Sequence, residues 1–178
     1  MDFSLLIEDK LSRIVQEHNL QIVARSRNYL KLSSELVTIV FSYDERENSC
    51  SLFAGARENS LYPIDDYILK NAFDSHLTIN QSTKEVFAEQ IATFFEQKGK
   101  PLISGSTQAL KALEKYVRKE SEEYTAQLIN QQQLDAASMA WDNGDYDEFV
   151  KYINKIDRQK LPSSLKRKYK IAIQKLSK

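Results

Sequence analysis

The clearest alternation of apolar and polar positions lies in residues 36–57. Every second residue of 37–43 is apolar, a polar stretch follows at 44–49, and the alternation resumes at 50–54. The apolar positions of this pattern are Val37, Ile39, Phe41, Tyr43, Cys50, Leu52 and Ala54. A period of two residues is typical of a strand with one buried face. The stretch therefore predicts a β-hairpin whose apolar face other elements must cover.

Two shorter strands are predicted before the hairpin, at residues 20–26 and 29–33. They are joined at Arg27 and Asn28, with Ile22, Leu30 and Leu32 as inward candidates. The connections between all four strands are too short for a parallel crossover, which needs a dozen residues or more. We therefore expect a four-stranded antiparallel meander over residues 20–57.

Helices are predicted on both sides of the meander. Residues 3–17 repeat apolar side chains every three or four positions, and Asp2 is the expected N-cap. A second helix is expected over residues 63–73, because proline suits the first helical turn. A third is expected over residues 82–97, where Ser82 opens a capping-box sequence. Together with the strands they predict an α+β domain over residues 1–104.

From residue 106 onwards the pattern is helical throughout. One apolar stripe consists of Leu110, Leu113, Val117, Tyr124 and Leu128, and a second, out of phase with it, of Leu134, Ala137 and Trp141. Because three glutamines at 131–133 separate the stripes, we expect a bend or a change of packing partner there. A tight turn is predicted at residues 142–145, with further helices from Tyr146 and from Pro162. Residues 105–178 are thus expected to form a helical extension packed on the α+β domain.

Part of this extension resembles a tetratricopeptide repeat unit. The resemblance rests on the small residues at 136, 137 and 140, on the turn at 144–146, and on Pro162 at the start of the next helix. The chain departs from the pattern at Phe149, where a small residue is usual, and at Gln133, where an aromatic is usual. The resemblance implies an adaptor that binds a peptide in a groove around Ala137, Trp141 and Tyr146. The alternative is a helical hairpin with a purely structural role.

Charge is segregated along a chain whose net charge is zero. Residues 158–178 carry eight basic residues and no acidic one, which leaves a net charge of −8 on residues 1–157. The basic segment either docks on the acidic body of the molecule or binds an external anion. Nucleic acid is the less favoured anion, because the acidic body would oppose its approach and the segment has only Tyr169 to stack on bases.

The remaining composition points to the cytoplasm. One cysteine excludes an intramolecular disulfide. No apolar run approaches the ~18 residues that span a bilayer, and the N-terminal stretch lacks the basic region of a signal peptide. We therefore expect a cytoplasmic protein with no membrane partner.

No combination of residues predicts catalysis, a cofactor or a metal site. The aspartates around Gly144 lack the spacing of a calcium loop, in which glycine is sixth and a glutamate twelfth. The two histidines, His18 and His76, are far apart in sequence. Cys50 is expected to point inward as a small apolar residue. The sequence thus predicts a protein that is not an enzyme.

The turn of the central hairpin carries the candidate binding residues Asp44, Glu45, Arg46 and Glu47. One interpretation is an ordinary solvated turn in which Arg46 pairs with its acidic neighbours. The other is a recognition loop, because binding residues are often carried on loops that a rigid sheet positions.

Over most of its length the chain resembles a group of small bacterial immunity-like proteins. The resemblance is carried by the N-terminal helix, by Asp44 and Arg46 at the strand end, and by a junction made of Gly99, Pro101, Leu102, Ile103 and Gly105. The group is uncharacterised or immunity-like, and the resemblance implies a partner-binding protein. Together with the absence of a readable active site and the charged surface of both signs, it favours an immunity protein that neutralises a cognate toxin. The alternative is the tetratricopeptide-like adaptor, with Trp141 and Tyr146 as its contact residues.

Overall fold

The computed structural model describes residues 1–56, 61–157 and 161–177. The chain divides into two compact units, Met1–Lys119 and Glu120–Lys178. This division falls inside helix α5 (Thr107–Asp142), whereas the predicted domain boundary at residue 105 precedes that helix. Arg57, at the end of the predicted meander, lies outside the described residues. So do Arg158, Lys160 and Lys178 of the predicted basic segment.

The first unit is built on a five-stranded antiparallel sheet in which each strand pairs with the next along the chain. The strands are β1 (Gln21–Ser26), β2 (Tyr29–Ser33), β3 (Thr38–Asp44), β4 (Ser49–Gly55) and β5 (Tyr62–Ile64). The predicted meander is therefore confirmed, and so is the α+β class. Only the fifth strand is added to it.

The fifth strand corrects the prediction that Pro63 opens a helix. Pro63 lies in β5 opposite Phe53, and the helix begins three residues later as α2 (Asp66–Phe73). Its N-cap is Asp65, whose carboxylate accepts a hydrogen bond of 2.9 Å from the N–H of Ile68. A proline fits an edge strand because it has no N–H to leave unpaired.

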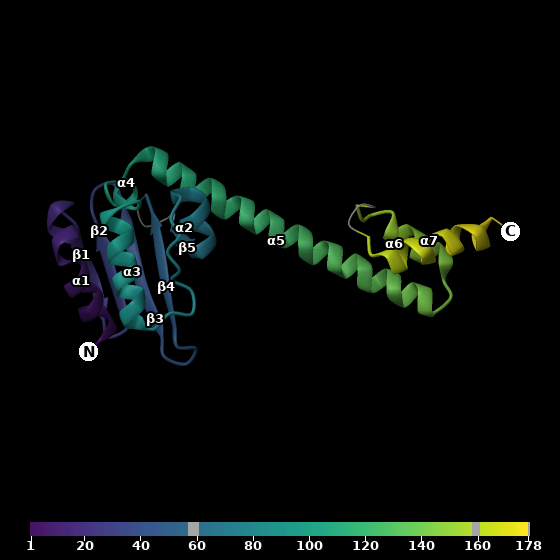
Figure 1. The fold of residues 1–178 in the computed structure, drawn as a ribbon, viewed down its shortest axis with the longest axis horizontal. Helices are drawn as coiled ribbons and strands as arrows, with labels where there is room; N and C mark the ends of the chain where they lie inside the picture. Colours follow the sequence, from purple (N-terminus) through teal and green to yellow (C-terminus); the bar gives the residue numbers. More distant parts are fainter. Residues whose placement is uncertain (57–60, 158–160, 178) are drawn as a thin grey trace. The chain divides into compact units, whose positions relative to one another are not determined.

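Helices cover one face of the sheet. Figure 1 shows α1 (Phe3–Glu17) and α3 (Lys84–Glu96) side by side across it, and the short α4 (Lys100–Ile103) follows α3. Inward residues of the strands and the apolar faces of these helices form one buried cluster. Its sheet members are Leu30, Leu32, Ile39, Phe41, Leu52, Ala54 and Ile64. The predicted inward positions of β2, β3 and β4 are thus confirmed.

Two local predictions in this unit are wrong. The side chain of Asp2 makes no cap hydrogen bond and instead lies 3.6 Å from the Arg27 guanidinium. Thr83, not Ser82, caps α3, because its hydroxyl accepts from the N–H of Val86. Ile22 lies opposite the buried Leu32 and thus on the inward face, as predicted, but it is 42% exposed because it lies on the edge strand of the sheet.

Edge strand β1 is exposed along its whole length. Its pairing with β2 shifts by one residue between Ile22 and Ala24, which leaves Val23 without an opposite residue as a β-bulge. Arg25, further along the strand, forms an ion pair of 2.9 Å with Glu8 of α1.

The second unit contains the C-terminal part of α5 together with α6 (Tyr146–Ile153) and α7 (Ser163–Leu176). Its buried cluster consists of Ala137, Ala140, Phe149, Ile153, Ile156, Leu161, Leu165 and Ala172. The small side chains in this set let the helices approach closely. The predicted turn at 142–145 and the two helices that follow it are confirmed.

Helix α5 runs without interruption through the glutamines at 131–133. Of the two predicted outcomes there, the change of packing partner is the one observed. Leu113 and Val117 belong to the core of the first unit, and Ala137 to that of the second. Tyr124 and Leu128, between them, are exposed.

Candidate functional site

The sheet face opposite the helices contributes no residue to the buried cluster of the first unit. We call it the outer face. Its side chains alternate with the inward ones along each strand. They are Tyr29, Lys31 and Ser33 of β2, Thr38, Val40 and Ser42 of β3, Ser49, Ser51 and Phe53 of β4, and Pro63 of β5. None of these residues belongs to the buried cluster of the unit.

The centre of the outer face is apolar. Val40 is only 6% exposed, although it is not a member of the cluster that the strands form with the helices. It is covered from the sides, because Lys31 and Phe53 are its partners on the two neighbouring strands. Phe53 in turn lies opposite Pro63. An apolar group in the middle of a solvent-facing sheet, with serines and a lysine around it, has the layout of a binding surface.

The predicted recognition loop closes one end of this face. Its backbone is fixed from within, because the Asp44 carboxylate accepts from the N–H groups of Arg46 (2.8 Å) and Glu47 (3.2 Å). The Tyr43 hydroxyl donates to the Asn48 side chain over 2.7 Å, and Asn48 has a left-handed backbone. The loop is therefore an ordered turn.

The interpretation in which Arg46 pairs with its acidic neighbours is wrong for the described residues, because Glu45 pairs with a different arginine. Arg27 lies 3.6 Å from the Glu45 carboxylate, whereas Arg46 and Glu47 form no ion pair among the described residues. A hollow of about 570 Å³ opens beside the loop and is shared with the outer-face residues Ser42 and Ser51. Arg46 and Glu47 thus stand at the edge of the outer face without an ion pair to any residue that the structure describes.

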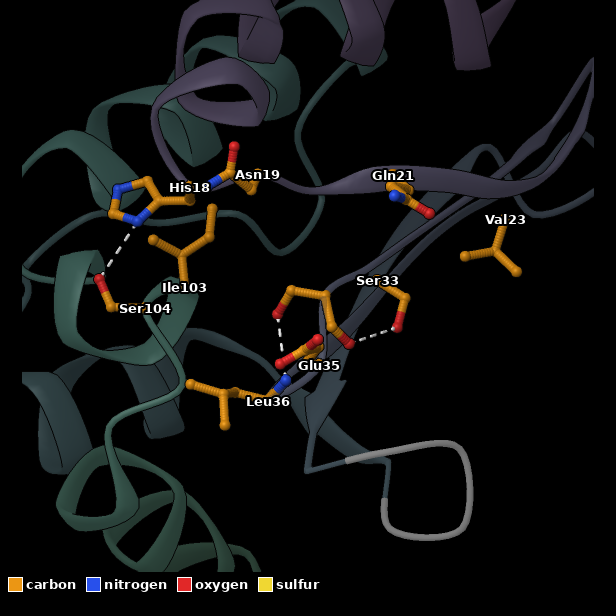
Figure 2. Close-up of a pocket in the computed structure, with 10 residues that line it drawn as sticks. His18, Asn19, Gln21, Val23, Ser33, Glu35, Leu36, Ile103 and Ser104 are labelled. Carbon is orange, nitrogen blue, oxygen red and sulfur yellow. Dashed lines mark hydrogen bonds between the residues drawn. The ribbon is translucent and has the colours of Figure 1, made fainter.

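A larger hollow of about 810 Å³ lies at the corner of the sheet, near the other end of the outer face (Figure 2). Gln21 and Ser33, which face each other across β1 and β2, line one side. His18 and Ser104 line another, and the exposed Leu36 lies below them in the picture. The sequence does not predict this hollow, because its lining comes from three separate segments, residues 18–23, 33–36 and 103–104.

The contact between His18 and Ser104 does not form a nucleophile and base. The Ser104 hydroxyl donates to the carbonyl of Lys100 over 2.9 Å, and its oxygen lies 3.2 Å from Nδ1 of His18. A histidine that activates a serine must accept the hydroxyl proton, which here is donated to a backbone carbonyl. The pair is a helix-end contact.

Cys50 is unsuited to nucleophilic chemistry. Burial, assisted by the nearby Glu85 carboxylate, raises the pKa of the thiol to about 11. The side chain packs against the core, as the sequence predicts. At neutral pH the group is therefore a protonated thiol, and the thiolate is the reactive form.

The reactivity of this thiol gives a direct test. Iodoacetamide at pH 8 is expected to alkylate Cys50 in the folded chain at least about tenfold more slowly than in the chain unfolded by guanidinium, because the thiolate fraction falls with the raised pKa. The rate should rise as pH approaches 11. Mass spectrometry of timed samples measures it. Equal rates in the folded and unfolded chains would contradict the burial of this side chain.

In the second unit, Trp141 and Tyr146 lie together. Their ring centroids are 5.4 Å apart in an edge-to-face arrangement, and Trp141 also packs edge-to-face on Phe149 at 5.2 Å. Lysines of α7 lie over both rings, Lys168 over Trp141 at 5.1 Å and Lys175 over Tyr146 at 4.3 Å. Both aromatic side chains are half-buried.

The predicted site residues therefore form two separate groups, the loop residues 44–47 in the first unit and Trp141 with Tyr146 in the second. The outer face itself was missed. A signal for it was present, since Val40 and Phe53 are apolar at positions where the alternation calls for polar side chains. No group of three metal-ligating side chains occurs in the described ranges.

No family model matches the chain, and neither do any of the curated proteins or solved structures with which it was compared. Within the described residues, no helix combines the length and the apolar character needed to cross a membrane.

Proposed function

We propose that this chain is a non-enzymatic protein that binds a protein partner through the outer face of its sheet and the loop at residues 44–47. The observation that carries the proposal is the apolar row of Val40, Phe53 and Pro63, which lies across neighbouring strands on the sheet face that no helix of the described residues covers. Protein interfaces commonly have an apolar centre inside a polar rim. Phe53 and Pro63 extend this centre, and the serines and the loop form its rim.

The loop suits such a role because it is already ordered. Two hydrogen bonds to the Asp44 carboxylate and the bond between Tyr43 and Asn48 hold its backbone. A surface that is ordered before binding loses less conformational entropy when it binds. Arg46 and Glu47 are left to contact the partner with charges of both signs.

The specific form of this proposal is a bacterial immunity protein that neutralises a toxin. A stoichiometric inhibitor needs a stable surface and no catalytic site. Charged rim residues give such inhibitors fast association and selectivity. Glu45 and Glu47 would contact basic residues of the toxin, and the apolar centre would be covered in the complex. Catalysis is not part of the proposal. The contact between His18 and Ser104 is a helix-end contact, and Cys50 is a half-buried, protonated thiol.

The proposal is tested by co-expression with a toxin domain encoded directly upstream of the gene. The expected results are a stable complex and protection of the host cell. Replacing Glu45 and Glu47 together by lysine should slow association by about tenfold, because two rim charges are reversed. Biolayer interferometry at two salt concentrations measures the association rate.

The matched control is Glu122→Lys with Asp142→Lys, which makes the same charge change at exposed positions of the second unit. It should leave the association rate within about twofold of the wild-type value, because these positions are not part of the proposed contact. Any effect of the overall charge is common to both variants, so the difference between them reports the loop alone. If neither a complex nor protection is obtained with the wild-type chain, the immunity function is wrong. If both double variants slow association equally, the loop is not the contact.

The tetratricopeptide-like adaptor receives less support from the geometry. Ala137, which the adaptor would place in its groove, is fully buried in the core of the second unit. The rings of Trp141 and Tyr146 are covered by Lys168 and Lys175 of the same unit. A peptide in that groove would have to displace these side chains.

A further inference from the structure

Helix α7 concentrates basic side chains that form no ion pair within the part of the chain that the structure describes. It carries no acidic residue and five basic ones, namely Lys166, Arg167, Lys168, Lys170 and Lys175. None of the five forms an ion pair with a carboxylate of the described ranges. In the neighbouring α6, by contrast, Lys151 pairs with Glu148 at 2.7 Å. The positive charge of α7 is therefore available to an external partner.

Part of this charge is arranged around an apolar side chain. Arg167, Lys168, Ile171, Gln174 and Lys175 are separated by steps of one, three and four residues, and such positions share one side of a helix. We call this set the α7 stripe. Ile171 lies at its centre and is 44% exposed. The helix uses its other side, with Leu165 and Ala172, for the core of the unit.

Two cations of the stripe are held in place. Lys175 donates to the Tyr146 hydroxyl over 2.7 Å and lies over the ring of that residue. Lys168 lies over the Trp141 ring. Ammonium groups fixed in this way lose less side-chain entropy when they pair with an anion. The stripe is thus a partly ordered array of positive charges next to an exposed isoleucine.

We propose that the α7 stripe binds an acidic segment of a protein, in which carboxylates flank an apolar side chain. The carboxylates pair with Arg167, Lys168 and Lys175, and the apolar side chain packs on Ile171. This surface belongs to the second unit alone. The proposal is therefore independent of the function assigned above to the outer face of the sheet.

The same observations weigh against the two other anionic partners. A single-stranded nucleic acid binds by stacking its bases on aromatic rings, but the lysines occupy the faces of Trp141 and Tyr146 that such stacking would use. A membrane-surface helix needs one continuous apolar face. The exposed Ile171 and Ile173 are two positions apart, about 200° around the helix, so they do not form such a face.

Trp141 makes the test direct, because it is the only tryptophan of the chain and lies under Lys168. The full chain is titrated in low salt with a 20-residue glutamate peptide in which leucines are spaced alternately three and four residues apart. Polyglutamate of the same length, single- and double-stranded DNA of 20 nucleotides, and phosphatidylglycerol vesicles are the comparison probes. Tryptophan emission should change saturably when the leucine-containing peptide is added. The chain should bind this peptide at least about fivefold more tightly than polyglutamate, because only this peptide covers Ile171.

Two pairs of variants locate the contact. Arg167→Gln with Lys175→Gln should weaken peptide binding about fivefold, the amount expected for two exposed ion pairs. Lys166→Gln with Lys170→Gln removes the same charge from positions outside the stripe and should weaken it less than about twofold. Ile171→Ser should remove the preference for leucine, whereas Ile173→Ser should keep it.

Several results would overturn the proposal. They are no saturable binding of the leucine-containing peptide, equal losses in the two double variants, or tighter binding of DNA or of vesicles than of the peptide. The last result would assign α7 to nucleic acid or to a lipid surface. Circular dichroism of each variant confirms that the helices are retained, so that a loss of binding is not a loss of fold.

Discussion

Replacing Phe41 by alanine is expected to lower the free energy of unfolding of the first unit by about 3–5 kcal/mol, the range typical of a buried phenylalanine. Phe41 has no exposed surface, lies between Leu30 and Leu52 on the neighbouring strands, and packs edge-to-face on Phe95 of α3. Its removal leaves a cavity between the sheet and the helices. Urea unfolding followed by far-ultraviolet circular dichroism measures the loss. Hydrogen exchange of the strand amides assigns it to this unit.

Phe53 provides the matched comparison, because it lies on the opposite side of the same pair of strands. Phe53→Ala should lower the free energy of unfolding by less than about 1 kcal/mol, since the side chain lies outside the core and only its contacts on the outer face are lost. The same substitution should weaken partner binding. A loss of stability equal to that of Phe41→Ala would mean that the outer face is covered within the folded chain.

Replacing Gly105 by alanine is expected to lower the free energy of unfolding of the first unit by about 2–5 kcal/mol. Gly105 has a φ of +70°, which costs an alanine about 1–2 kcal/mol. A methyl group there would lie 2.3 Å from the Cβ of Leu36, far inside van der Waals contact. Relief of such a clash moves the backbone and adds about 1–3 kcal/mol. Hydrogen exchange near Leu36 and Gly105 measures the effect locally.

Gly144 separates the two causes. It has a similar φ of +75°, but nothing lies within 4 Å of the position its Cβ would take. Gly144→Ala should therefore lower the free energy of unfolding of the second unit only by the backbone cost of about 1–2 kcal/mol. Trp141 emission during urea unfolding measures this change. In the first unit, Leu36→Gly removes the clashing atom and should recover part of the loss caused by Gly105→Ala. No recovery in this double-mutant cycle would contradict the clash.

The sheet could be predicted well because its strands and their pairing are determined by short stretches of sequence. The alternation over residues 37–43 and 50–54 identifies both the strands and their inward side, and short connections permit only antiparallel pairing. Pro63 misled the prediction because the first turn of a helix and an edge strand both tolerate a missing N–H. Only the pairing with Phe53 distinguishes the two, and that pairing is not local.

Less of the candidate site could be predicted. The turn at residues 44–47 was identified from its position after a strand, but its ion pair with Arg27 joins segments that only the folded sheet brings together. The corner hollow of Figure 2 has the same origin. The cations of α7 were counted from the sequence. Their arrangement on Trp141 and Tyr146 depends on how three helices pack, which composition does not determine.

The irregular pairing of β1 has a consequence for solubility. A straight edge strand offers a row of unpaired N–H and C=O groups on which another chain can extend the sheet, and this is a common route to aggregation. The bulge at Val23 interrupts that row, and Arg25 places a charge beside it. At the opposite edge, β5 is only three residues long and contains Pro63. Both edges of the sheet are thus protected against fibril-like growth by backbone pairing with other chains.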